Sequence, residues 1–144
     1  MIDGRYDAKM IKVYDLCADK KHIKDVQHAT LETDDFGLQS EHGLFGSQEW
    51  WTAVEKGVIP KVVIEGMISR VYMSGHNDFP EFEITTETGK SSWERLGDEK
   101  FYAVGRKCKI IYALQKFKKP LPMPGNKEEK FSKIVIELWI GASQ

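Results

Sequence analysis

The sequence predicts a mainly β protein: a small five-stranded antiparallel barrel, OB-like or SH3-like, with one short helix and an N-terminal strand extension. Three observations favour this class. After Pro60 the apolar residues follow the period of two that is typical of strands. Residues that favour turns, mainly Gly, Asn, Asp and Pro, separate these segments. A closed barrel would also remove the exposed edges that five short strands otherwise leave.

Length and composition are those of a globular protein. The 144 residues are 41% hydrophobic and 30% charged, which predicts one domain able to bury a core. No apolar run approaches the roughly 20 residues of a membrane span, and the N-terminus lacks an apolar signal segment, so we expect a cytoplasmic protein without membrane contact. We divide the single domain 1–144 into N-terminal strands and loops (1–46), a helix (47–57) and the barrel core (61–141).

The N-terminal region shows little regular pattern. Residues 9–16, "KMIKVYDL", alternate as a strand does, whereas residues 17–27 are polar and are predicted to be irregular. Residues 28–35, "HATLETDD", can form a short second strand, with Ala29 and Leu31 on one face.

The one clear helix is predicted over residues 47–57. Ser47 is a typical N-cap residue and Gly57 a typical C-terminal stop. Trp50 and Trp51 diverge by about 100° on a helix, so at most one of them faces the core.

The barrel strands follow Pro60. The first, 61–73, has apolar residues on both faces and contains Gly66, which predicts a bulge or bend. The remaining segments are strands at 82–87, 91–95, 107–117 and 131–140, with a proline-rich loop at 118–130 before the last strand.

The stretch "MSGHNDFPEFEI" (73–84) is predicted to be a hairpin turn. Gly75, Asn77 and Asp78 tolerate turn geometry and lie between two predicted strands. Alternation then places Glu81 and Glu83 on one face of the second strand.

The same stretch contains the main candidate catalytic or metal residues; Ser40, Glu41 and His42 also lie together, but neighbours in sequence cannot establish a triad. His76, Asp78 and Glu81 could supply three ligands, but no second histidine lies at a suitable spacing, and we predict no metal, cofactor or catalytic residue. A small hydrolase using Glu81 or Glu83 with His76 stays open as an alternative. The two cysteines, Cys17 and Cys108, form no disulfide framework or zinc motif, and Cys108 is expected to be buried.

Charge is distributed unevenly along the chain. Residues 1–99 hold 11 Lys and Arg against 19 Asp and Glu, whereas residues 100–144 hold 10 against 3. This asymmetry is typical of a protein with an anionic partner, or of one whose halves attract each other. The candidate binding residues are Arg106, Lys107, Lys109, Lys116, Lys118 and Lys119.

These observations favour a non-enzymatic binding module that acts through protein–protein contacts, including self-association. Three observations carry this hypothesis: the sequence has no recognisable catalytic motif, its charge is uneven, and its long first strand has apolar residues on both faces. The alternative is an OB-like single-stranded nucleic-acid-binding protein that uses the six cations with Tyr112 or Phe117 as stacking surfaces. A pI of about 6.4 weighs against it.

Overall fold

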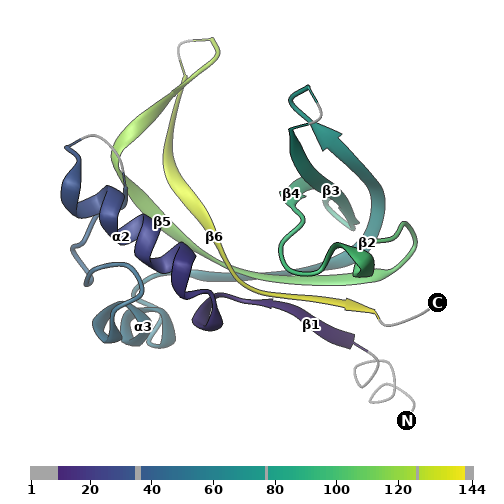
Figure 1. Cartoon of the computed structure of the whole chain (residues 1–144), viewed down its shortest axis with the longest axis horizontal. Coiled ribbons are helices and arrows are strands. Elements are labelled where there is room, and N and C mark those ends of the chain that lie inside the picture. Colours follow the sequence, from purple (N-terminus) through teal and green to yellow (C-terminus); the bar gives the residue numbers. More distant parts are fainter. Residues whose placement is uncertain (1–9, 35–36, 77, 126, 142–144) are drawn as a thin grey trace. The chain divides into compact units, whose positions relative to one another are not determined.

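The computed structural model describes residues 10–34, 37–76, 78–125 and 127–141 (Figure 1). Six antiparallel strands form one sheet in the order β1-β6-β5-β2-β3-β4. The strands are β1 (Met10–Asp15), β2 (Lys61–Ser74), β3 (Phe79–Thr86), β4 (Gly89–Glu94), β5 (Lys107–Met123) and β6 (Lys127–Gly141). The helical elements are η1 (Leu16–Ala18), α2 (Lys20–Glu32), α3 (Gln48–Glu55) and η2 (Glu99–Phe101). The predicted mainly β, barrel-like antiparallel class is confirmed.

The chain divides into two compact units, each of which is described by itself. Unit 1 comprises Met1–Asp15, Val63–Ile111 and Glu137–Gln144, and unit 2 comprises Leu16–Val62 and Tyr112–Ile136. Strands β2, β5 and β6 contribute to both units, because the unit boundaries fall within them. The single domain 1–144 stays a prediction.

In unit 1, β2, β3 and β4 form an antiparallel meander and β1 pairs with β6. Phe82 and Ile84 of β3 are fully buried, together with Ile68 of β2, while Phe82 packs on the Tyr102 ring at 4.9 Å between centroids. Burial raises the pKa of the Tyr102 phenol well above its usual value. Because side chains alternate along a strand, Glu81 lies on the opposite face of β3 from this core, as predicted.

The long first strand is confirmed. The register of β2 against β3, which is defined from Met67 onward, shifts between Ile68 and Arg70, and the predicted bulge or bend at Gly66 stays a prediction. Gly66 allows a close backbone approach, since a Cβ there would lie 2.1 Å from the carbonyl oxygen of Thr85. This glycine is therefore required by the pairing of two strands.

In unit 2, α3 confirms the predicted helix. The Ser47 hydroxyl accepts a hydrogen bond from the Trp50 backbone N–H at 3.2 Å, which caps the helix. Trp50 is fully buried against the Phe45 ring at 4.8 Å, and Trp51 is half-buried. One of the two tryptophans therefore faces the core, as expected.

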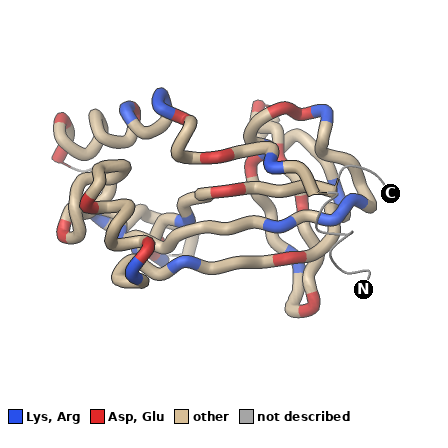
Figure 2. Tube along the Cα trace, turned by 90° about the horizontal axis from the view of Figure 1, so that it is seen from below, with Lys and Arg blue, Asp and Glu red and all other residues tan. Residues whose placement is uncertain are grey.

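Helix α2 corrects two predictions, the irregular segment 17–27 and the short strand 28–35. The Asp19 side chain accepts a backbone hydrogen bond at 3.3 Å and caps the helix. Ile23 and Thr30, seven residues apart, are its only buried positions. Lysines and acidic residues occur along the helix (Figure 2), and its buried stripe was too narrow to recognise in the sequence.

The predicted proline-rich loop 118–130 is also corrected. β5 continues to Met123 and β6 begins at Lys127, so most of the segment is a hairpin. Pro120 and Pro122 are compatible with β5 because they occupy alternate positions, where their missing N–H groups fall on one edge of the strand. The period of two expected after Pro60 is confirmed in β6, where Ile134, Ile136, Leu138 and Ile140 are buried.

Candidate protein-binding surface

The six predicted basic residues are divided between the two units. Arg106, Lys107 and Lys109 belong to unit 1, whereas Lys116, Lys118 and Lys119 belong to unit 2. The structure therefore provides no basis for treating them as one groove. Their role in partner binding stays a prediction, and each group of three is described in its own unit below.

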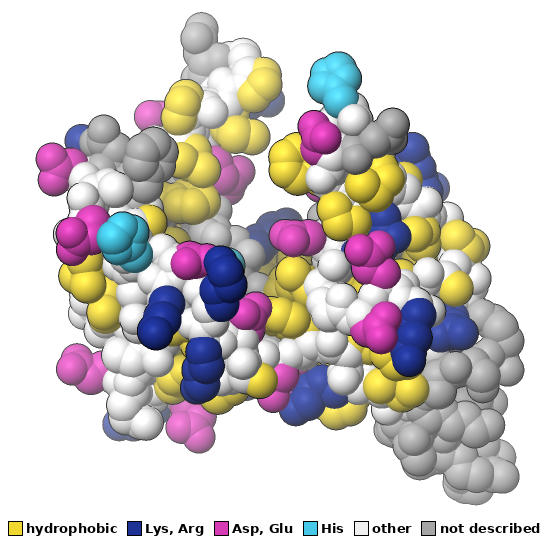
Figure 3. Space-filling view, viewed as in Figure 1, with side chains coloured by type: hydrophobic (Ala, Val, Ile, Leu, Met, Phe, Trp, Pro, Cys, Tyr) yellow, Lys and Arg dark blue, Asp and Glu magenta, His cyan; other side chains and the backbone are white. Residues whose placement is uncertain are grey.

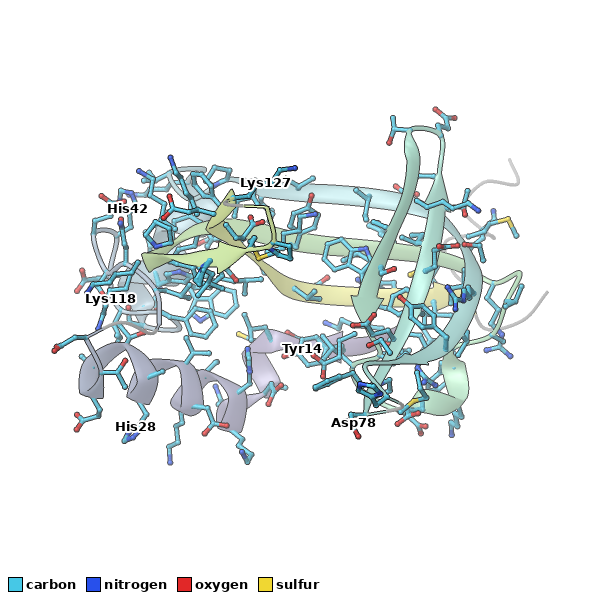
Figure 4. The ribbon with its side chains drawn as sticks, turned by 90° about the horizontal axis from the view of Figure 1, so that it is seen from above. Tyr14, His28, His42, Asp78, Lys118 and Lys127 are labelled. Carbon is cyan, nitrogen blue, oxygen red and sulfur yellow. The ribbon has the colours of Figure 1, made fainter. Side chains whose placement is uncertain are left out.

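Arg106 and Lys118 each make internal hydrogen bonds. The Arg106 guanidinium donates to the carbonyl of Phe101 at 3.3 Å. The Lys118 ammonium donates to the carbonyls of Thr30 and Thr33 at the C-terminal end of α2, the latter at 2.5 Å (Figure 4). The negative end of the helix dipole favours a cation at this place, so Lys118 stabilises the fold.

Lys107 and Lys109 line a groove that lies within unit 1. Its volume is about 1130 Å³, and the strands β1, β2, β3, β5 and β6 all contribute to it. The groove is lined by Met10, Glu65, Gly66, Met67, Ser69, Thr85, Thr86, Glu87, Lys107, Cys108, Lys109 and Trp139.

The composition of the groove suits a protein partner. Met67 is 47% exposed, and Met10 and Trp139 are half-buried, so apolar surface is available within it. Two lysines and two glutamates also line it. Protein interfaces combine apolar contacts, enriched in Met and Trp, with a polar rim, and the flexible Met side chain adapts to irregular surfaces.

The indole of Trp139 is held in place by its neighbours. Its Nε1–H donates to a carboxylate oxygen of Glu137 at 2.9 Å, and the Lys12 ammonium lies 5.5 Å from its ring centroid. The ring is therefore oriented before any partner binds, which lowers the entropic cost of using it as a contact.

Cys108 contributes to the same groove but is not a reactive thiol. Its side chain is almost fully buried, as predicted, and burial raises the pKa of the thiol to about 12. The thiolate is the nucleophilic form, so this residue remains protonated and unreactive near neutral pH.

Glu81 and Glu83 form part of a hydrogen-bonded polar face on the β2–β3–β4 meander. The Tyr72 hydroxyl bridges Glu81 Oε1 at 2.9 Å and Ser92 Oγ at 2.8 Å. The Ser69 hydroxyl donates to Glu83 Oε1 at 2.8 Å. Both carboxylates thus have hydroxyl partners from neighbouring strands.

His76 lies exposed in the β2–β3 turn with φ of 60°, a left-handed conformation. The Asp78 N–H donates to the carbonyl of Ser74 at 3.1 Å, which confirms the predicted hairpin turn. Asn77 falls outside the described residues. Within the described part of the chain, no three His, Cys, Asp or Glu side chains group as metal ligands would. No helix there is long and apolar enough to cross a membrane.

Trp139 and Met67 were not among the predicted binding residues. The alternation of β6 did place Trp139 opposite the buried Leu138 and Ile140, and a large aromatic on the outer face of a strand was the available signal. The groove itself could not be predicted, because it depends on strands far apart in the sequence.

Comparison with known proteins gives one result. The family model described as "Immunity protein RhsI2" matches residues 10–141. A search of curated proteins finds no match. An immunity protein has a protein-binding role, which agrees at that level with the predicted binding module. Because the match spans nearly all of the sequence, the chain belongs to the immunity protein RhsI2 family.

Proposed function

We propose that this chain is a non-enzymatic immunity protein that binds an Rhs toxin and neutralises it by direct contact. The observation that carries the proposal is the family match over residues 10–141. Because the match includes every strand and both α-helices, the proposal concerns the fold as a whole and not an isolated motif.

The groove of unit 1 is the surface that we assign to the toxin. Trp139 is oriented by Glu137, and Met67 offers an adaptable apolar contact in the same groove. Tryptophan is among the residues that dominate binding energy at protein interfaces. Lys107 and Lys109 would then select acidic groups of the toxin at the rim.

The other functions considered from the sequence receive less support. The cations of the nucleic-acid alternative are divided between units, and Lys118 is hydrogen-bonded to α2. In the hydrolase alternative, His76 is exposed in a turn while Glu81 bonds with Tyr72. Self-association and cytoplasmic residence stay predictions.

The direct test is a calorimetric titration of the purified chain with its cognate Rhs toxin domain, together with growth of cells that express the toxin. We expect a stable complex and restored growth when the chain is co-expressed. Met67→Glu should lower the affinity about tenfold or more, because a charge would be buried at the contact.

The matched control is Val104→Glu, an equivalent change at a residue of unit 1 that is 61% exposed and does not line the groove. It should bind the toxin as the unchanged chain does. Absence of any complex would refute the proposed function, whereas equal binding by both variants would refute only the assignment of the groove.

A further inference from the structure

In the outer part of the β5–β6 hairpin, nearly all side chains are exposed to solvent. We define the basic arm as residues 116–125 and 127–133. From Lys119 to Phe131, every described side chain except Leu121 is exposed, so both faces of the ribbon are open. Met123 is 45% and Phe131 43% exposed, and Figure 3 shows hydrophobic side chains at this end of the hairpin. A two-stranded ribbon gains little from such residues by itself.

One edge of the arm is closed to strand pairing. The Lys118 N–H donates to the carbonyl of Gly37 at 3.0 Å, and the Lys116 carbonyl accepts from Gln39 at 3.1 Å. Even-numbered residues of β5 thus direct their backbone groups away from β6. Alternation places Pro120 and Pro122 on this same edge, where neither has an N–H to donate. A partner therefore cannot add a strand at this edge, and the exposed side chains are the contacts that it offers.

The prolines also make the arm stiff. Proline fixes φ near −65°, so Pro120, Pro122 and Pro124 restrict the chain before any contact forms. An element that is ordered in advance loses less conformational entropy on binding. The arm is therefore suited to present its side chains to a partner in one arrangement.

The charge of the arm indicates the chemistry of that partner. The arm contains six lysines and two glutamates. Lys118 bonds with α2, and the other five lysines, Lys116, Lys119, Lys127, Lys130 and Lys133, are exposed. A positively charged surface attracts an acidic surface over a distance and accelerates association with it.

We propose that the basic arm is a second contact for the Rhs toxin, in which Met123 and Phe131 enter an apolar recess surrounded by acidic residues. This inference rests on the proposed function and adds the charge and polarity of the toxin surface. The lysines guide the encounter, and the two apolar side chains hold the complex together.

The test uses the full chain and its cognate toxin domain in surface plasmon resonance at two salt concentrations. Lys116→Glu, Lys127→Glu and Lys130→Glu together should slow association about tenfold or more at low salt and weaken its salt dependence. Met123→Ser with Phe131→Ser should speed dissociation about tenfold or more. Because all five residues are exposed, thermal unfolding should change little.

The chain offers a control for each variant. Lys20→Glu, Lys24→Glu and Lys56→Glu change the same charge at exposed lysines elsewhere in unit 2. Met73→Ser with Phe79→Ser removes the same side chains from the β2–β3 hairpin, where they are 42% and 59% exposed. Both controls should bind the toxin normally.

Equal effects in the controls, or unchanged binding by both arm variants, would overturn the inference. The inference would also be overturned if the arm variants kept toxin binding but lost oligonucleotide binding or self-association. The arm would then be assigned to nucleic acid or to a second copy of the chain. An unaltered chain that binds no toxin would instead refute the proposed function.

Discussion

Two hairpins of this protein expose the same pair of residue types in different surroundings. The β2–β3 hairpin exposes Met73 and Phe79, and the β5–β6 hairpin exposes Met123 and Phe131. The first is extended by β4, and its strands share a network of hydroxyl and carboxylate groups. In the second, exposed lysines and alternate prolines surround the apolar residues.

The difference shows that an exposed apolar residue does not define a site. In the β2–β3 hairpin, polar side chains such as Glu81 and Tyr72 form hydrogen bonds with one another, so these groups have partners within the same face of the sheet. In the basic arm, most lysines are exposed, and the edge formed by β5 is closed to strand pairing. We therefore propose the arm, and not the outer part of the β2–β3 hairpin, as the second contact in addition to the groove, and a structural role for the hydroxyl network.

The largest effect is expected at the base of the β2–β3 hairpin. Gly66→Ala would place a Cβ against the carbonyl of Thr85, and the two strands must separate to accept it. We expect a loss of about 3 kcal/mol in the free energy of unfolding, measured with denaturant. A loss below about 1 kcal/mol would show that this close approach is not needed.

A smaller effect is expected at the base of the basic arm. Lys118→Met removes the ammonium that bonds with the terminal carbonyls of α2, and should cost about 2 kcal/mol of stability. Lys116→Met, at an exposed neighbour, should cost less than about 0.5 kcal/mol in the same denaturation experiment. Equal costs would mean that Lys118 is a surface lysine like the others.

The smallest effect is expected within the hydroxyl network. Tyr72→Phe removes the bridge between Glu81 and Ser92 and should lower stability by about 1 kcal/mol or less, because the site is only partly buried. Toxin affinity should stay unchanged in a parallel titration. A tenfold loss of affinity with normal stability would place the hydroxyl network itself in the binding surface.

The parts of the fold that follow local rules were predictable from the sequence. Strict alternation identified β6, and the N-cap Ser47 with Gly57 identified α3. Helix α2 was missed because its buried face is so narrow that few residues signal it. The hairpin at 118–130 was missed because proline normally ends a strand, and only the position of the edge shows why Pro120 is tolerated.

The candidate site was less predictable than the fold. Lys107 and Lys109 were identified by charge, and both line the groove. Trp139 and Met67 reach the same groove from other strands, and strand pairing of this kind cannot be read from the local pattern. Lys118 shows the opposite error, since a cation in a basic segment can serve a helix terminus instead of a partner.

Hydrogen–deuterium exchange of the chain with and without its cognate Rhs toxin domain tests the central claim most directly. We predict that the toxin slows exchange at residues 65–69 and 107–109, which border the groove, and in the basic arm, and leaves residues 74–76 and 78–79 of the β2–β3 turn unchanged. Slower exchange at that turn, with no change in the groove or the basic arm, would contradict the account.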